Sequence, residues 1–317
     1  MFYGPVLSRR FGYSLGVDLI PLKVCVYDCI YCQLGKTTNK TIERKKYVDI
    51  NFEEFKDELT KKIKSYPYID YITFSGSGEP TLNSDIGRLI AIAKENSNIP
   101  VAVLTSGGIL SFDEVIDDIS GADLIKVSLD ATDDRMFKKI NRPSKGINFD
   151  KNIKGLKKLM ERFSGNIWLE IMLMEKVNDD LENAHKFKSV IESMGDNIEK
   201  IHLNTPVRSL EERMGRNPVK IPQMKRLNEI KKILGNKAKI IGEISRKKYN
   251  SNMAGIEKEI IELLKRRPVR IKEIAFSLGL NINEVIKFTG KLLDMGEIER
   301  VVRNDMEYYF KPGGSGI

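Results

Sequence analysis

The sequence has few of the residues that mark secreted and membrane proteins. Its 317 residues include three cysteines, one tryptophan and two histidines. The three cysteines all lie within residues 25–32, and such an odd, clustered set is a poor basis for a disulfide framework. No apolar run approaches the ~18 residues that a membrane span needs. Residues 1–16 lack the apolar core and cleavage site of a secretory signal. We therefore expect a cytoplasmic protein that is not inserted in a membrane.

Positive charge is in excess, and it is unevenly distributed along the chain. Lysine and arginine outnumber the acidic residues by 53 to 44, a net charge of +9. After Ala254 the chain has eleven basic and ten acidic residues, so nearly all of the excess precedes that point. An anionic partner of the larger, N-terminal part is one interpretation. A solvated basic surface is the alternative.

Short apolar segments alternate with amphipathic ones through most of the chain. The predicted strands cover residues 14–20, 71–75, 101–105, 124–129, 167–173 and 200–204, and the predicted helices cover 52–65, 86–95, 112–119, 152–162 and 181–193. Nearly continuous apolar strands are typical of parallel sheets covered by helices. The pattern predicts an α/β fold, a partial parallel (β/α)6 barrel over residues 1–242, with functional groups at the carboxyl ends of its strands. A further helix near 225–234 and a strand near 239–242 would complete it.

The remainder of the chain follows a different pattern. Residues 243–254 are predicted to form a linker, and residues 255–317 a small winged-helix domain of three helices (256–267, 271–280 and 281–296) and a hairpin. Its third helix offers only Lys287 and Lys291 as basic residues, whereas nucleic-acid-binding modules usually present a distinctly basic face. We therefore expect this domain to serve in docking or substrate recognition, with nucleic-acid binding as the alternative.

Cys25, Cys29 and Cys32 form a C-x3-C-x2-C motif. Three thiolates on one loop can ligate three irons of a cubane cluster and leave the fourth iron open. A structural zinc ion would need a fourth protein ligand, and neither His185 nor His202 lies near the loop in sequence. The motif favours a [4Fe–4S] cluster over zinc or a group of buried thiols.

This spacing resembles that of the radical S-adenosylmethionine (SAM) superfamily. The resemblance implies that the methionine part of SAM chelates the open iron, and that the aromatic residue before the third cysteine, Tyr31, contacts adenine. It also implies a reaction: a low-potential donor such as ferredoxin or flavodoxin reduces the cluster, and SAM is cleaved to a 5′-deoxyadenosyl radical that abstracts hydrogen from a substrate.

The segment YITFSGSGEPTL is predicted to be a strand that ends in a glycine-rich turn. Small residues let the backbone approach a ligand, and backbone carbonyls and the Glu79 carboxylate can accept hydrogen bonds from an ammonium group. Ser77, Gly78 and Glu79 match the superfamily's glycine–glycine–glutamate motif, which implies contact with the methionine amino group of SAM. A strained turn with a solvated glutamate is the alternative.

Other predicted strands also end on polar residues. Thr105 and Ser106 follow one strand, Ser128 and Asp130 follow the next, and Asn204 ends the sixth. The resemblance implies that such residues bind the ribose hydroxyls and the methionine carboxylate, with Asp130 as the partner of the ribose diol and Asn204 near adenine or substrate. Helix capping is the alternative for the first four.

Several charged residues are candidates for substrate or anion binding. Glu170 interrupts an apolar strand, where a carboxylate is costly unless it is paired. We expect it to point into the barrel and to pair with Arg142 or bind a ligand. Arg9 and Arg10 precede the first predicted strand and are expected to neutralise a carboxylate or phosphate, or to pair with surface acids. Arg208 could meet an anion or remain solvated.

The combination of GPVLSRR, the cysteine loop, FSGSGEPTL, SLDA and NRP resembles the superfamily's oxidoreductase branch related to the wybutosine-synthesis enzymes, which remodel a tRNA guanosine. Those enzymes carry additional cysteines for a second cluster, and this chain has none. With the net positive charge, the resemblance makes tRNA modification the first substrate hypothesis. Activation of a partner protein and modification of a small metabolite remain alternatives. So does a redox-sensing winged-helix transcription regulator.

Overall fold

The computed structural model describes residues 1–206, 219–241, 256–278, 280, 282–303 and 306–313. In this part of the chain one sheet has the strand order β1-β2-β5-β6-β7-β8-β9-β10. Its strands are β1 (Phe2–Ser8), β2 (Gly12–Val17), β5 (Tyr71–Phe74), β6 (Val101–Thr105), β7 (Leu124–Ser128), β8 (Asn166–Met172), β9 (Lys200–Asn204) and β10 (Ala238–Ile240). All neighbours are parallel except β1 and β2. The predicted α/β class with a mostly parallel sheet is therefore confirmed.

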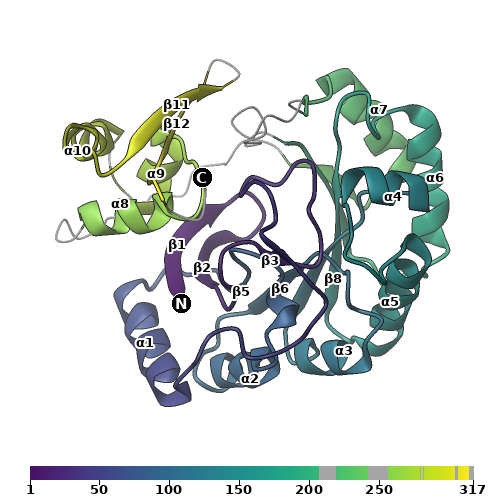
Figure 1. The fold of residues 1–317 in the computed structure, drawn as a ribbon, viewed down its shortest axis with the longest axis horizontal. Coiled ribbons are helices and arrows are strands. Elements are labelled where there is room, and N and C mark those ends of the chain that lie inside the picture. The colour runs from purple at the N-terminus through teal and green to yellow at the C-terminus, as the bar shows by residue number, and fades with distance from the viewer. Residues whose placement is uncertain (207–218, 242–255, 279, 281, 304–305, 314–317) are drawn as a thin grey trace.

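Helices cover the outer face of the curved sheet (Figure 1). They are α1 (Phe52–Ser65), α2 (Ile86–Glu95), α3 (Asp113–Ile119), α4 (Asp134–Ile140), α5 (Phe149–Arg162), α6 (Leu181–Glu192) and α7 (Met224–Leu234). Local signals start several of them: the Asn51 side chain accepts hydrogen bonds from the first turn of α1, and Asp180 does the same for α6. Strand β1 and helix α4 were not predicted. No described helix is long and apolar enough to cross a bilayer.

Side chains alternate between the two faces of the central strands. On β7, Val127 packs in the main hydrophobic core, while Lys126 and Ser128 face a cavity inside the curved sheet. The inner face is apolar at one end, where the rings of Phe11 and Trp168 stack with centroids 5.3 Å apart. Polar inner side chains therefore gather nearer the carboxyl ends of the strands.

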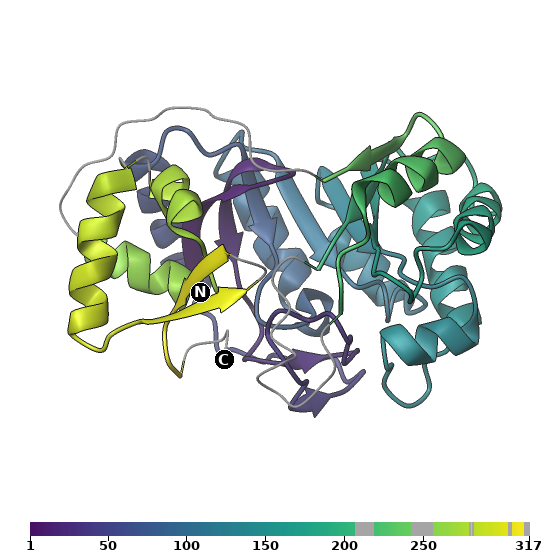
Figure 2. The same ribbon diagram turned by 90° about the horizontal axis from the view of Figure 1, so that it is seen from above.

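A separate module, residues 256–313, packs against β1 (Figures 1 and 2). It contains α8 (Ile256–Leu264), α9 (Ile271–Leu278), α10 (Ile282–Asp294) and the antiparallel strands β11 (Glu299–Arg303) and β12 (Met306–Phe310). It has its own apolar core, which includes Ile260, Leu264 and Val285. Three helices and a hairpin are the elements predicted here, while the winged-helix class itself stays a prediction. The predicted linker lies outside the described residues.

Candidate active site

A cavity of about 400 Å³ opens at the carboxyl ends of the strands. Its walls come from the β1–β2 turn, the cysteine loop, the glycine turn after β5, the ends of β7, β8 and β9, and the segment around the end of α8. Cys25, Cys32 and Tyr31 line it together with Ser77 and Gly78. The fold thus brings the predicted cluster loop and the predicted SAM-binding turn into one cavity.

The cysteine loop begins at β3 (Val24–Cys25), which pairs with β4 (Asn39–Lys40). The Lys23 ammonium donates to Cys32 Sγ at 3.1 Å, and the Asn141 amide donates to Cys29 Sγ at 3.6 Å. Burial raises the pKa of the Cys25 thiol to about 12, so such donors, or bound iron, are needed to favour the thiolate. No three Cys, His, Asp or Glu side chains among the described residues converge as ligands of one ion. A cubane suits three separated thiolates because each ligates a different iron.

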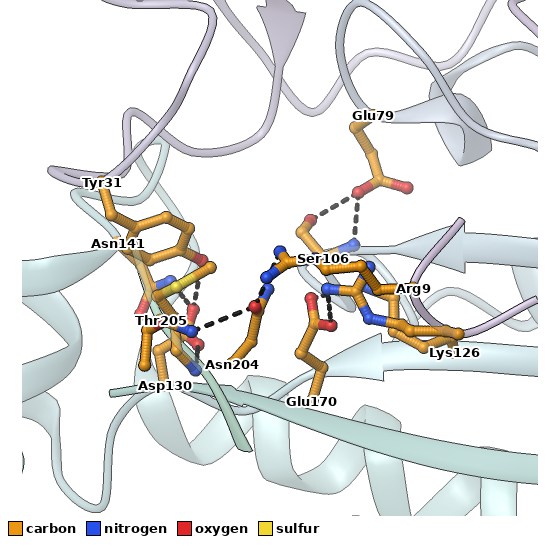
Figure 3. A network of polar contacts seen from close by, with 12 residues as sticks. Arg9, Tyr31, Glu79, Ser106, Lys126, Asp130, Asn141, Glu170, Asn204 and Thr205 are labelled. Carbon is orange, nitrogen blue, oxygen red and sulfur yellow. Dashed lines mark hydrogen bonds and ion pairs between the residues drawn. The ribbon is translucent and has the colours of Figure 1, made fainter. Parts of the chain in front are cut away.

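Glu79 is 1% exposed and lies at the centre of a hydrogen-bond network. Its Oε1 accepts from the backbone and hydroxyl of Thr81 and from Thr105 Oγ1, at 2.7–3.2 Å. Its Oε2 accepts from the backbone and hydroxyl of Ser106, at 2.7 and 2.5 Å (Figure 3). Five donors occupy this carboxylate, so the solvated-glutamate alternative is wrong. Glu79, Thr105 and Ser106 form a unit that fixes the turn, and SAM binding by these residues stays a prediction.

The glycine turn is held directly against the cysteine loop. The carbonyl of Ser77 accepts from the Lys23 N–H at 2.7 Å, and its hydroxyl donates to Asp18 at 2.6 Å. A Cβ at Gly78 would stand 1.9 Å from the Val24 carbonyl oxygen. The two predicted motifs therefore touch through their backbones, next to Cys25.

Tyr31 and Asp130 are joined by a hydrogen bond. The Tyr31 hydroxyl donates to Asp130 Oδ2 at 2.5 Å, and the Asn141 amide donates to the same oxygen at 2.9 Å (Figure 3). The backbone N–H of Met172 donates to Oδ1 at 2.9 Å. Asp130 accepts three hydrogen bonds from the protein and orients the ring of Tyr31, whereas Ser128 lines the 400 Å³ cavity; the predicted ribose contact of Asp130 stays a prediction.

Glu170 points into the barrel as predicted, but its partner was predicted incorrectly. It pairs with Arg10 and, at 2.9 Å, with Lys126. Arg142 instead lies on the cysteine-loop side, 3.8 Å from Asp28. Although burial alone would raise it, the charges of Arg10 and Lys126 lower the pKa of Glu170 to about 2. The carboxylate is ionised and binds two cations across the inner face.

Arg9 lies beside Arg10 on the β1–β2 turn and donates to Asn204 Oδ1 at 3.1 Å (Figure 3). Both arginines and Asn204 line the cavity, as the prediction of a ligand-facing position requires. Arg208 lies outside the described residues. Lys23 and Lys126, which also line the cavity, were not among the predicted site residues. Side chains two residues apart on a strand point to the same face, so the position of Lys126 two residues before Ser128 indicates that Lys126 also faces inward.

His202 makes the free energy of unfolding depend on pH. Its side chain is buried in the barrel, and its Nδ1 has no hydrogen-bond partner among the described residues. Burial and the neighbouring Arg10 charge lower the pKa of His202 from 6.5 to about 4. Between these two values the unfolded chain binds the proton and the folded chain does not, so stability falls as the pH drops.

We therefore expect the free energy of unfolding to decrease by about 2 kcal/mol between roughly pH 7.5 and pH 5 through this group. Urea titrations at the two pH values measure the loss. The His202→Gln variant serves as the comparison and should lose correspondingly less over the same interval. Equal losses in both proteins would contradict a buried, neutral imidazole.

Comparison with known proteins identifies the family. The Radical SAM superfamily model matches residues 19–187, a segment that contains the cysteine loop, the glycine turn and the ends of β6 and β7. The chain belongs to the radical SAM superfamily. Enzymes of this superfamily use a [4Fe–4S] cluster and SAM, so the protein is an enzyme with these cofactors. The three-thiol loop described above has the donor set that such a cluster takes.

Two relatives extend the similarity beyond the matched segment. A UPF0026 protein of Methanocaldococcus jannaschii is 30% identical over 98% of this radical SAM chain and 95% of its own length. A Brachyspira hyodysenteriae protein named GTPase Obg is 34% identical over 97% of this chain, which spans only 44% of that relative. A radical SAM methyltransferase structure from Sphaerobacter thermophilus shares the fold: the TM-score is 0.53 at 19% identity, covering 72% of this chain and 65% of that one. The wybutosine branch stays a prediction.

Proposed function

We propose that this radical SAM enzyme binds its cluster through Cys25, Cys29 and Cys32 and abstracts hydrogen from an organic substrate held in the same cavity as SAM. The observation that supports this most is the single cavity lined by two of the cysteines, the glycine turn and the polar strand ends. When bound, cluster and SAM supply a one-electron cleavage that yields the abstracting radical. The protein binds, orients and shields the reactants.

Specific residues suit these tasks. Tyr31, oriented by Asp130 at 2.5 Å, is proposed to pack against adenine. Ser128 and Asn204 line the cavity and are proposed to donate to the nucleoside. The turn at Gly78 offers backbone groups to the methionine ammonium, while Glu79 holds that turn from behind rather than binding the ligand.

The reductant and the substrate belong to the proposal as well. We propose a low-potential donor such as ferredoxin or flavodoxin, because the chain has no cysteines beyond the cluster motif for a second centre. The tRNA role stays a prediction. The 256–313 module is proposed to recognise substrate, since Leu263 and Arg266 line the cavity. If the protein were a transcription regulator, the module would bind DNA and would not need to line that cavity.

The test is SAM cleavage by the reconstituted protein. The full chain is loaded with iron and sulfide without oxygen, reduced with dithionite and assayed for 5′-deoxyadenosine, beside a Cys29→Ala variant. We expect nucleoside from the wild type and at least ~100-fold less from the variant, because loss of one thiolate removes a cluster ligand. A fully loaded, reducible cluster whose EPR spectrum does not change on addition of SAM would contradict the proposal.

A further inference from the structure

The lining of the cavity is strongly cationic. Six of its lining residues are basic and one, Glu170, is acidic; the basic ones are Arg9, Arg10, Lys23, Lys126, Arg266 and Arg267. Lys23 is already bonded to a cysteine thiol. A cluster with three thiolates has about one negative charge, and SAM has about one positive charge. The cofactors therefore do not neutralise the remaining cations.

The four arginines among these cations come from two parts of the chain that are far apart in sequence. Arg9 and Arg10 lie on the turn between β1 and β2, and Arg266 and Arg267 lie two and three residues after the end of α8 in the C-terminal module. The module is packed against β1 (Figure 1). Its docking thus places two arginines at the cavity that the β1–β2 turn also lines.

Arg266, one cation of this wall, is held in place before any ligand binds. Arg266 forms an ion pair with Asp18 at 2.5 Å, and its guanidinium lies 4.1 Å from the ring centroid of Tyr3. Tyr3 is bonded to Ser75 of the glycine turn at 2.8 Å. Such preorganisation lowers the entropic cost of binding.

Among the described residues, Glu170 and Asp18 pair with three of the six cations that line the cavity. Arg10 and Lys126 share the one Glu170 carboxylate, and the buried Arg10 Nε has no hydrogen-bond partner among the described residues. Arg9 donates a hydrogen bond to the side-chain oxygen of Asn204. Several arginines around one cavity suit the charge and the many acceptor oxygens of a phosphate group better than a single carboxylate.

We propose that the substrate of this enzyme is a small organic phosphate ester, with its phosphate bound by Arg9 and Arg10 of the β1–β2 turn and by Arg267 of the C-terminal module. This inference rests on the proposed function and specifies its substrate class. A cavity of about 400 Å³ that also holds SAM admits a small molecule. In the C-terminal module, Lys291 of α10 pairs with Glu257 at 2.8 Å. Its positive charge is therefore neutralised, and this does not favour RNA binding at that surface.

The test measures binding of inorganic pyrophosphate to the SAM-loaded, cluster-containing protein by calorimetry at low salt. We expect Arg9→Met and Arg267→Met each to weaken binding about tenfold or more, since each removes charge-assisted hydrogen bonds. The matched control is Arg300→Met, which removes one charge from the same module at an exposed ion pair with Glu307. It should bind pyrophosphate as the wild type does.

Two further binding measurements, with succinate and with bulk tRNA, test other ligand classes. Succinate bound as tightly as pyrophosphate would overturn the phosphate assignment. Bulk tRNA bound by a protein that does not bind pyrophosphate, with equal losses in Arg267→Met and Arg300→Met, would instead indicate a surface for RNA. Thermal unfolding verifies that each variant is folded, and Arg267→Gln serves as a milder replacement. Absence of phosphate binding in a protein that still produces 5′-deoxyadenosine refutes this inference alone, whereas absence of SAM cleavage refutes the proposed function.

Discussion

Replacing Gly78 by alanine is expected to prevent assembly of the cluster site. The added Cβ would stand 1.9 Å from the Val24 carbonyl oxygen and 2.7 Å from a side-chain carbon of Ile20. The first of these atoms is backbone and cannot rotate away, so either the glycine turn or the start of the cysteine loop must move. Overpacking of this kind costs about 3 kcal/mol, and the shift falls next to Cys25. We expect the iron content after reconstitution to fall to less than about a third of wild type.

The measurement combines iron and sulfide analysis with urea unfolding of the cluster-free protein. Gly290→Ala is the control: apart from the backbone of its own helix, no described heavy atom lies within 4 Å of a Cβ there, and the position is inside α10. Alanine in a helix interior should be neutral or stabilising by up to about 1 kcal/mol. Full cluster loading in Gly78→Ala would show that the two loops do not need their close contact.

The Glu79→Gln substitution is expected to destabilise the protein even before any cofactor binds. Both carboxylate oxygens accept hydrogen bonds, and an amide presents an NH2 group to donors that include the Ser106 N–H or the Thr81 N–H. With the side chain 1% exposed, no water can replace the lost acceptor. Hydrogen bonds to a buried charge contribute about 1.5–3 kcal/mol each, so we expect a loss of about 3 kcal/mol in the free energy of unfolding.

This measurement separates two roles for Glu79. If the residue only bound the SAM ammonium, the cluster-free protein would unfold at the same urea concentration as the wild type, and only the affinity for SAM would change. If it organises the turn, stability and SAM affinity fall together. Glu43→Gln, at a side chain that is 64% exposed, is the control and should change stability by less than about 0.5 kcal/mol.

Local sequence was sufficient for the parts of the protein that depend on nearby residues. The spacing of Cys25, Cys29 and Cys32 is a property of one loop, and it identified the cofactor class. Strands and helices followed from apolar periodicity and from capping residues such as Asn51, because both act within one or two turns of the chain. The position of the polar residues at the strand ends followed from the rule that parallel strands place these ends together.

The partners of the buried polar groups were decided only by the tertiary structure. Glu170 was expected near Arg142, but strand pairing places it opposite Ser128 on β7, within reach of Lys126, and the β1–β2 turn brings Arg10 to it. The donors to Glu79 from Thr105, at the end of β6, and from Ser106, directly after it, could not be predicted from the sequence either. Such partners are set by strand order and by which turns cross the barrel mouth. These are long-range features, and no local pattern encodes them.

The docking of the C-terminal module is the clearest case. Composition and periodicity separated this module from the barrel, and its near-neutral charge left its role open. The ion pair of Arg266 with Asp18 joins residues from opposite ends of the chain and places the segment after α8 at the cavity. The sequence alone determined the chemistry of the cluster loop, because that chemistry depends on three cysteines and their spacing. The tertiary structure determined which charges surround the cavity, because contacts between distant segments form only when the chain is folded.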